Sequence, residues 1–148
     1  MADTLNFKSR TGILSCTPED FSEFISDLRN LKQFMTVEYV NDLKIERENV
    51  SFNVSPLGNV RMWLSEKNPA RSIIFSGIVL GSNNFRLLFG IDQNEEKRAA
   101  VNVVLDAEIS PILQMMVSGP VKKFLEILVS EMEKFTGWSN PYQQIQSP

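Results

Sequence analysis

A chain of 148 residues with 43% hydrophobic and 22% charged residues has an ordinary globular composition and is long enough for one domain with a buried core. Its net charge of −3 and pI near 5.0 argue against a nucleic-acid partner, because phosphate binding needs clustered Lys and Arg, and Lys122–Lys123 is the only adjacent lysine pair. One cysteine and no histidine exclude an internal disulfide, a multi-cysteine metal site and catalysis built on histidine.

The N-terminal residues lack the apolar core of a signal peptide, and no apolar run approaches the roughly 20 residues that cross a bilayer. We therefore expect a cytoplasmic protein in which 1–137 form a single domain and 138–148 a polar tail. Cys16, just before a helix start, is expected to be structural, and Asp106 and Glu108 to be solvated rather than to hold a cation. The sequence predicts no cofactor and no metal site.

The first predicted elements are a strand and a helix pair. Alternation over 5–16 predicts a strand that places Phe7 and Arg10 on opposite faces. Thr17 as N-cap and Pro18 at the first helical position then mark the start of a helix. Its apolar residues recur every three or four positions, as in a helix with one buried face. A short second helical turn is expected to follow.

The middle of the chain predicts a run of strands, because the apolar period there changes to two. Breaks of about three to five turn-forming residues favour successive antiparallel strands over parallel crossovers. The predicted strands are 40–46, 50–55, 60–66, 72–81, 85–92 and 99–109.

Residues 110–135 predict the longest helix, which is capped by Ser110 and stopped by Gly137. Its apolar residues follow the three-and-four spacing, so the helix is expected to lie on the sheet. Gly119 and Pro120 near its middle predict a bend, because proline removes one helix hydrogen bond and crowds the carbonyl four residues back.

The order of strand, helix pair, six strands and long helix indicates an α+β fold with helices on one face of an antiparallel sheet. With "SRTGILSCTPEDFSEFISDLRN" at its front and "AEISPILQMMVSGPVKKFLEILV" at its back, the sequence resembles the START-like superfamily, most closely its small bacterial single-domain members. That superfamily includes the birch-pollen allergen family, polyketide cyclases and lipid-transfer domains. The resemblance implies the helix-grip fold, in which a curved antiparallel sheet of about seven strands holds a long kinked C-terminal helix on its concave face.

In that superfamily the space between the sheet and the last helix often holds an apolar ligand. The resemblance therefore implies non-enzymatic binding of a small hydrophobic ligand or lipid in a cavity there. Methionines at the start of the helix would adapt to what lies beneath it, although methionine is also common core filler. Strand alternation toward the inner face and position in the family fold predict the residues that line the cavity: Phe34, Met35, Met62, Phe75, Phe89, Val103, Met115 and Met116.

One alternative is an interaction domain with a filled core. The outer face of the later strands, where polar residues are expected, carries an apolar patch, which favours a protein interface in a homodimer. The tail, with Trp138, Tyr142 and Ile145, could instead fold back over part of this patch. The predicted interface residues are Trp63, Ile74, Ile78, Leu88 and Val104.

A second alternative is an enzyme of the polyketide cyclase type. It would need an Asp or Glu with a raised pKa inside the cavity, whereas the inward positions inferred from alternation are almost all apolar. The polar exceptions are Ser9 and Thr11 on the first strand. A catalytic role is therefore the least favoured of the three, and no catalytic residue is predicted.

Overall fold

The computed structural model describes residues 4–31, 33–34, 40–46, 48–54, 58–79, 81 and 83–138. Two strands, a helix pair, six strands and a long helix follow one another along these residues. The strands are β1 (Thr4–Lys8), β2 (Gly12–Ile13), β3 (Val40–Ile45), β4 (Asn49–Val54), β5 (Gly58–Asn68), β6 (Ser72–Val79), β7 (Asn83–Gln93) and β8 (Ala99–Glu108). The helices are α1 (Pro18–Ser26), α2 (Leu28–Leu31) and α3 (Pro111–Lys134).

All the strands belong to one curved antiparallel sheet in the order β1-β8-β7-β6-β5-β4-β3, with β2 also pairing with β8. Each consecutive pair from β3 to β8 is antiparallel, so the prediction from the short turns is confirmed. The first strand pairs with the last, since Phe7 of β1 lies opposite Leu105 of β8. The predicted α+β helix-grip architecture is therefore confirmed.

The single first strand predicted over 5–16 is wrong, because Ser9–Thr11 interrupts it. The hydroxyl of Ser9 accepts a hydrogen bond from the Val103 backbone N–H at 2.8 Å and donates one to the carbonyl of Arg10 at 2.8 Å. A side chain thus takes the place of a backbone carbonyl in the ladder with β8. Beyond this break the chain resumes pairing as β2.

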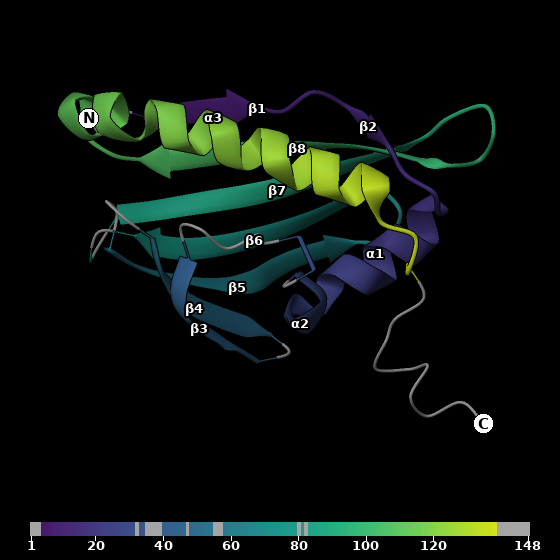
Figure 1. The fold of residues 1–148 in the computed structure, drawn as a ribbon, viewed down its shortest axis with the longest axis horizontal. Coiled ribbons are helices and arrows are strands. Elements are labelled where there is room, and N and C mark those ends of the chain that lie inside the picture. Colours follow the sequence, from purple (N-terminus) through teal and green to yellow (C-terminus); the bar gives the residue numbers. More distant parts are fainter. Residues whose placement is uncertain are drawn as a thin grey trace.

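The helices cover one face of the sheet. Figure 1 shows α3 crossing this concave face near β1, β2 and β8, while α1 and α2 lie at the end of the sheet that is farthest from the first turns of α3. Both long helices begin as predicted: the Thr17 hydroxyl accepts from the Asp20 N–H at 3.2 Å, and the Ser110 hydroxyl from the Leu113 N–H at 3.4 Å. Gly12 lets β2 approach α3, because a Cβ there would overlap Val129.

α3 ends at Lys134 with Phe135 as its C-cap, one residue before the predicted end at 135 and ahead of the predicted stop at Gly137. The carbonyl of Phe135 accepts hydrogen bonds from the Ser15 hydroxyl and from the indole N–H of Trp138, both at 3.0 Å. These two bonds fasten the chain after the helix to the chain before α1. Pro120 lies inside α3 without ending it, and the bend predicted at that position stays a prediction.

Candidate functional site between the sheet and the long helix

The concave face of the sheet is apolar over most of its width. Along β4 to β8, alternate side chains point to this face, and the register aligns them in rows such as Phe75, Leu87 and Leu105. The inward positions are Val50, Phe52, Val60, Met62, Leu64, Ile73, Phe75, Gly77, Val79, Phe85, Leu87, Phe89, Ile91, Val101, Val103, Leu105 and Ala107. Lys67 also lies on this face: after the irregularity in β5 it pairs with Ile73, and its ammonium contacts the Glu23 carboxylate of α1 at 3.1 Å. The apolar positions named above can hold an apolar molecule but offer it no charged partner.

One end of the layer between this face and α3 is filled by aromatic side chains, and we call it the packed end. Trp138 packs against Phe21, Phe24, Phe34 and Phe135 with ring centroids 4.9–5.6 Å apart. The cluster continues into the sheet through Phe89, whose ring lies 5.9 Å from Phe21 and 5.8 Å from Phe75. Nearly all these rings are completely buried, so this end is closed by side chains.

At the other end, three side chains remain only half-buried although they belong to the concave side. Phe85 of β7, Leu105 of β8 and Leu113 in the first turn of α3 pack against the core while keeping part of their surface accessible. We call this the accessible end. Leu64, on β5, is half-buried in the same way. The helix therefore leaves apolar surface uncovered here that a ligand can contact.

A glycine shapes this accessible end. Gly77 lies opposite Phe85 in the register, and a Cβ at Gly77 would overlap the Phe85 ring and the carbonyl oxygen of Arg61. The absence of a side chain at Gly77 lets the ring lie across the sheet instead of standing away from it. The position of Phe85, and with it the shape of the apolar surface, depends on this glycine.

The predicted lining residues divide between these regions. Phe75, Phe89 and Val103 are fully buried at the base of the layer, and Met62 is nearly so. Phe34 belongs to the aromatic cluster of the packed end. Met35 lies outside the described residues. Strand alternation in the sequence places Leu64, Phe85 and Leu105 on the inward face. It does not mark them as accessible, because the extent to which α3 covers them depends on where the helix lies.

Met115 and Met116 do not point inward. Their exposed fractions are 83% and 53%, so neither lines the layer in this conformation and neither is core filler. The buried side of α3 consists of Val117, Val121, Leu125, Leu128, Val129 and Met132. At 100° per residue, Met116 falls on the opposite side of the helix from these residues and Met115 falls at the edge of their arc, beside Val129, which the three-and-four spacing alone did not resolve.

The apolar patch on the convex face exists as a row across three strands. Ile74 lies opposite Leu88, which lies opposite Val104, and Trp63 and Ile78 flank this row on the same face. Ile74 is buried and the other four are half-buried, so the patch partly covers itself. Its role as an interface stays a prediction.

Trp138 does not cover this patch, because it is buried in the aromatic cluster on the concave side, at 4% exposure. The alternative in which this residue folds back over the convex face is therefore wrong. Trp138 was also placed in the polar tail, whereas it packs as part of the core. Tyr142 and Ile145, the other two residues of that alternative, lie outside the described residues.

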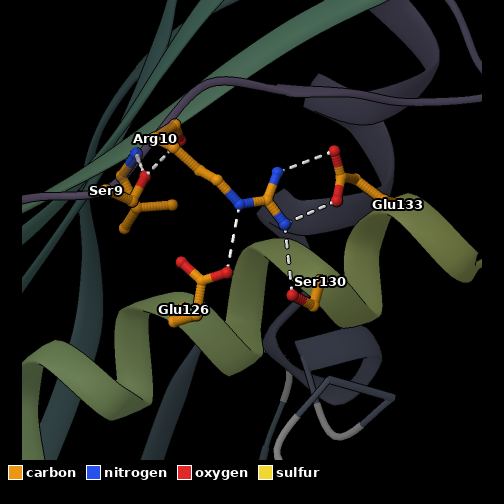
Figure 2. A network of polar contacts seen from close by, with 6 residues as sticks. Ser9, Arg10, Glu126, Ser130 and Glu133 are labelled. Atoms are coloured by element: carbon orange, nitrogen blue, oxygen red, sulfur yellow. Dashed lines mark hydrogen bonds and ion pairs between the residues drawn. The ribbon is translucent and has the colours of Figure 1, made fainter.

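Arg10 forms the main polar contact of α3 with the sheet edge. Its guanidinium donates to both carboxylate oxygens of Glu133 at 2.7 and 2.9 Å, to Glu126 at 3.1 Å and to the Ser130 hydroxyl at 3.1 Å (Figure 2). The hydrogen bonds from Arg10 hold the pKa of Glu133 below its ordinary value. Because the interruption at Ser9–Thr11 turns Arg10 toward the helix, strand alternation could not predict this contact.

Cys16 is buried beside the start of α1. Burial, together with the nearby Asp20 carboxylate, raises the pKa of its thiol to about 12. The thiol is therefore protonated at neutral pH and does not act as a nucleophile there. A helix N-terminus lowers the pKa of a nearby thiol, but here the effect of burial is larger. The structural role predicted for Cys16 agrees with this environment.

Ionisable groups are scarce in the described interior. The buried polar or charged side chains among the described residues are Ser22, Asp27 and Asn30, all in or next to the helix pair. The Asp27 carboxylate is paired with Arg29 at 2.6 Å, and the Asn30 amide donates to the Phe24 carbonyl at 2.9 Å. Over the same part of the chain, no cluster of three or more potential ligands could hold a metal ion, and no helix is long and apolar enough to span a bilayer.

Comparison with known proteins identifies the fold. No family model matches the chain, and no curated protein sequence matches it. Among solved structures, a norcoclaurine synthase point mutant from Thalictrum flavum, in complex with a transition-state analogue, superposes with a TM-score of 0.68 at 9% identity, covering 90% of this chain and 94% of that one. The same enzyme in complex with dopamine and hydroxybenzaldehyde gives 0.63 at 8% identity, covering 92% and 90%.

A third similar structure is a conserved protein from Geobacillus kaustophilus, with a TM-score of 0.66 at 13% identity over 88% of this chain and 93% of that one. Identities this low establish the architecture and leave the activity open. The sheet order, the helix pair after the first strands and the long final helix all agree with these structures. The helix-grip fold that the resemblance implied is thus confirmed, and this chain has that fold.

Proposed function

We propose that the protein binds a small apolar ligand, without catalysing a reaction, at the accessible end of the layer between the sheet and α3. The observation that carries the proposal is the half-burial of Phe85, Leu105 and Leu113 on a concave face where other inward side chains of the same strands, such as Leu87 and Ala107, are buried. Apolar surface of this kind contributes about 25 cal/mol per Å² when a ligand covers it.

The chemistry of the described surface supports an uncharged ligand or a ligand with a long apolar part. Around Phe85, Leu105 and Leu113 the described inward side chains of the sheet have no hydrogen-bonding groups, so any polar part of the ligand would have to remain at the rim, in contact with water. One of the similar structures, the norcoclaurine synthase, is in complex with dopamine and hydroxybenzaldehyde, which supports small-molecule binding by this architecture. Proton-transfer catalysis would need an ionisable group next to the ligand, and the described inward positions around Phe85, Leu105 and Leu113 supply none.

The test uses two adjacent positions on β8 that point to opposite faces. Leu105→Trp fills the accessible end, whereas Val104→Trp adds the same side chain to the convex face. Native mass spectrometry and fluorescence titration with a fatty-acid mixture and a set of small aromatic molecules measure binding. We expect Leu105→Trp to weaken binding at least about tenfold, roughly 1.4 kcal/mol, and Val104→Trp to leave it unchanged.

Two results would overturn the proposal: a wild-type protein that binds none of these molecules, or equal losses in the two tryptophan variants. Circular dichroism with thermal unfolding establishes that each variant is folded. If Leu105→Trp does not fold, Leu113→Trp places the same volume on α3 from the other side of the layer and takes its place.

A second candidate function is self-association through the convex face. The specific observation is the unbroken row of Ile74, Leu88 and Val104 across three adjacent strands, where a solvated antiparallel face normally carries polar residues. Size-exclusion chromatography with light scattering tests it. Leu88→Lys should convert a dimer to a monomer, while Asn102→Lys, on the same face, should not; a monomeric wild type would reject this candidate.

A further inference from the structure

The exposed large apolar side chains among the described residues all belong to α3. They are Ile112 at 73%, Met115 at 83%, Met116 at 53% and Phe124 at 36% exposure. Ile112, Met115 and Met116 are spaced three and four residues apart, so they form one outward-facing patch on the first turns of the helix. We call these three residues the apolar tip. Contiguous exposed apolar side chains on a soluble domain mark a contact surface.

The charge around the apolar tip differs from that of the rest of the protein. From Ile109 to Leu125 the sequence contains Lys122 and Lys123 and no Asp, Glu or Arg, although the whole chain carries −3. Lys123 follows Met116 by two helical turns and therefore lies on the same side of α3, and both lysines are exposed. Of the acidic side chains farther along the helix, Glu126 and Glu133 are paired with Arg10, and Glu131 lies 4.0 Å from the ammonium of Lys134.

The apolar tip also has a defined place in the fold. In Figure 1 the first turns of α3 lie at the end of the sheet away from α1 and α2, which is the accessible end of the layer. Leu113, which lines that end, lies in the same turn as Ile112 and next to the tip. A surface that contacts the tip would therefore face the half-buried residues of the proposed ligand site.

From these observations we infer that the first turns of α3 dock on the surface of an anionic lipid membrane. An apolar helical face flanked by lysines is the arrangement that inserts into the boundary between headgroups and acyl chains, with cationic side chains near the lipid phosphates. The complementarity between the first part of α3, which carries two lysines and no acidic residue before Glu126, and an anionic bilayer favours this partner over a second copy of the acidic chain. If the proposed ligand site operates, the docked tip gives its ligand a path from the bilayer; docking itself does not depend on that function.

The experiment is sedimentation of the full chain with vesicles of phosphatidylcholine, with and without phosphatidylserine. We expect the wild type to bind the anionic vesicles, and Met115→Glu/Met116→Glu to bind at least about tenfold more weakly. Glutamate and methionine have similar helix propensities, so this variant should fold. Its control, Gln93→Glu/Thr136→Glu, adds the same charge at exposed positions outside α3 and should bind as the wild type does.

A further variant, Lys122→Gln/Lys123→Gln, should lose about tenfold or more of the affinity for anionic vesicles and bind neutral vesicles unchanged. The inference is overturned if the wild type binds neither kind of vesicle, if the methionine variant and its control bind alike, or if the protein forms a dimer that the methionine variant dissociates while vesicles are not bound. Binding of soluble ligands by a protein that ignores vesicles would reject docking and leave the proposed function in place. Vesicle binding without ligand binding would support docking and reject the proposed function.

Discussion

The two ends of the layer beneath α3 are built from the same kinds of side chain but differ in how far those side chains are covered. Phe89 and Phe85 illustrate the difference, since both lie on β7, point to the concave face and are separated by two strand periods. Phe89 is completely buried against Phe21 and Phe75, whereas Phe85 is half-buried. Strand alternation thus decides which face a residue joins, and the covering helices decide how much water it keeps.

The two ends of the layer are covered differently because the aromatic residues of the covering helices are concentrated at one end. Phe21 and Phe24 of α1, with Phe34, Phe135 and Trp138, close the packed end, and the last turns of α3 are fastened there. The first turns of α3 direct their large apolar side chains outward instead. A domain can therefore combine a rigid, filled core at one end with uncovered apolar surface at the other.

The sharpest test of this contrast compares two phenylalanine truncations on β7. Phe89→Ala should lower the free energy of unfolding by about 3–5 kcal/mol, because it removes a fully buried ring and leaves a cavity. Phe85→Ala should cost only about 1–2 kcal/mol, because part of that ring is already in contact with water. Urea denaturation measures both. Equal losses would mean that the two ends are packed alike.

The next test concerns the surface of the accessible end. Gly77→Ala should destabilise the protein by about 1–3 kcal/mol, because the added methyl group overlaps the Phe85 ring and the Arg61 carbonyl, and the backbone has to move. Ser76→Ala, one residue earlier and on the convex face, is the control and should cost less than about 1 kcal/mol. Thermal and chemical denaturation report the effect. Gly77→Ala with wild-type stability would show that Phe85 swings away at no cost.

Cys16 tests the packed end through pH. The pKa of its thiol is about 12 in the folded protein and 9.0 in the unfolded chain. The buried thiol therefore contributes fully to stability below pH 9, and this contribution is lost as the pH rises toward 12. At pH 10 we expect a loss of about 1 kcal/mol relative to pH 8 that is missing from Cys16→Ala. Denaturation curves of both proteins at the two pH values measure it, and a thiol reagent should label native Cys16 far more slowly than unfolded protein. Parallel pH profiles would contradict the burial of the thiol.

The smallest effect is expected at the Arg10 contact, which is partly exposed. Arg10→Ala should cost about 0.5–1 kcal/mol at neutral pH, after allowance for solvent screening. In the folded protein the hydrogen bonds from Arg10 lower the pKa of Glu133 below its ordinary value of 4.5. The stabilisation by this ion pair is therefore present above pH 4.5 and is lost as the pH falls through the folded-state pKa. The difference between wild type and Arg10→Ala should therefore shrink in acid and in high salt. A difference that is unchanged at low pH would assign the loss to packing.

The sequence by itself determined the elements and most of their faces. Thr17–Pro18 and Ser110–Pro111 marked both helix starts, because capping and proline geometry are local. Alternation placed Phe75, Phe89 and Val103 on the inner face and Ile74, Leu88 and Val104 on the outer face, since a strand has a strict period of two. Short turns required antiparallel neighbours, and the order of elements indicated an α+β fold, for which the resemblance to the START-like superfamily implied the helix-grip architecture.

Only the tertiary structure decided which apolar residues are covered. The outward direction of Met115 and Met116 depends on which side of α3 meets the sheet, and several apolar positions satisfied the helical spacing equally well. The burial of Trp138 depends on aromatic partners far away in the sequence, and the turn of Arg10 toward α3 depends on the hydrogen bonds of Ser9 with β8. In each case the deciding contact is long-range, and local periodicity carries no information about such contacts.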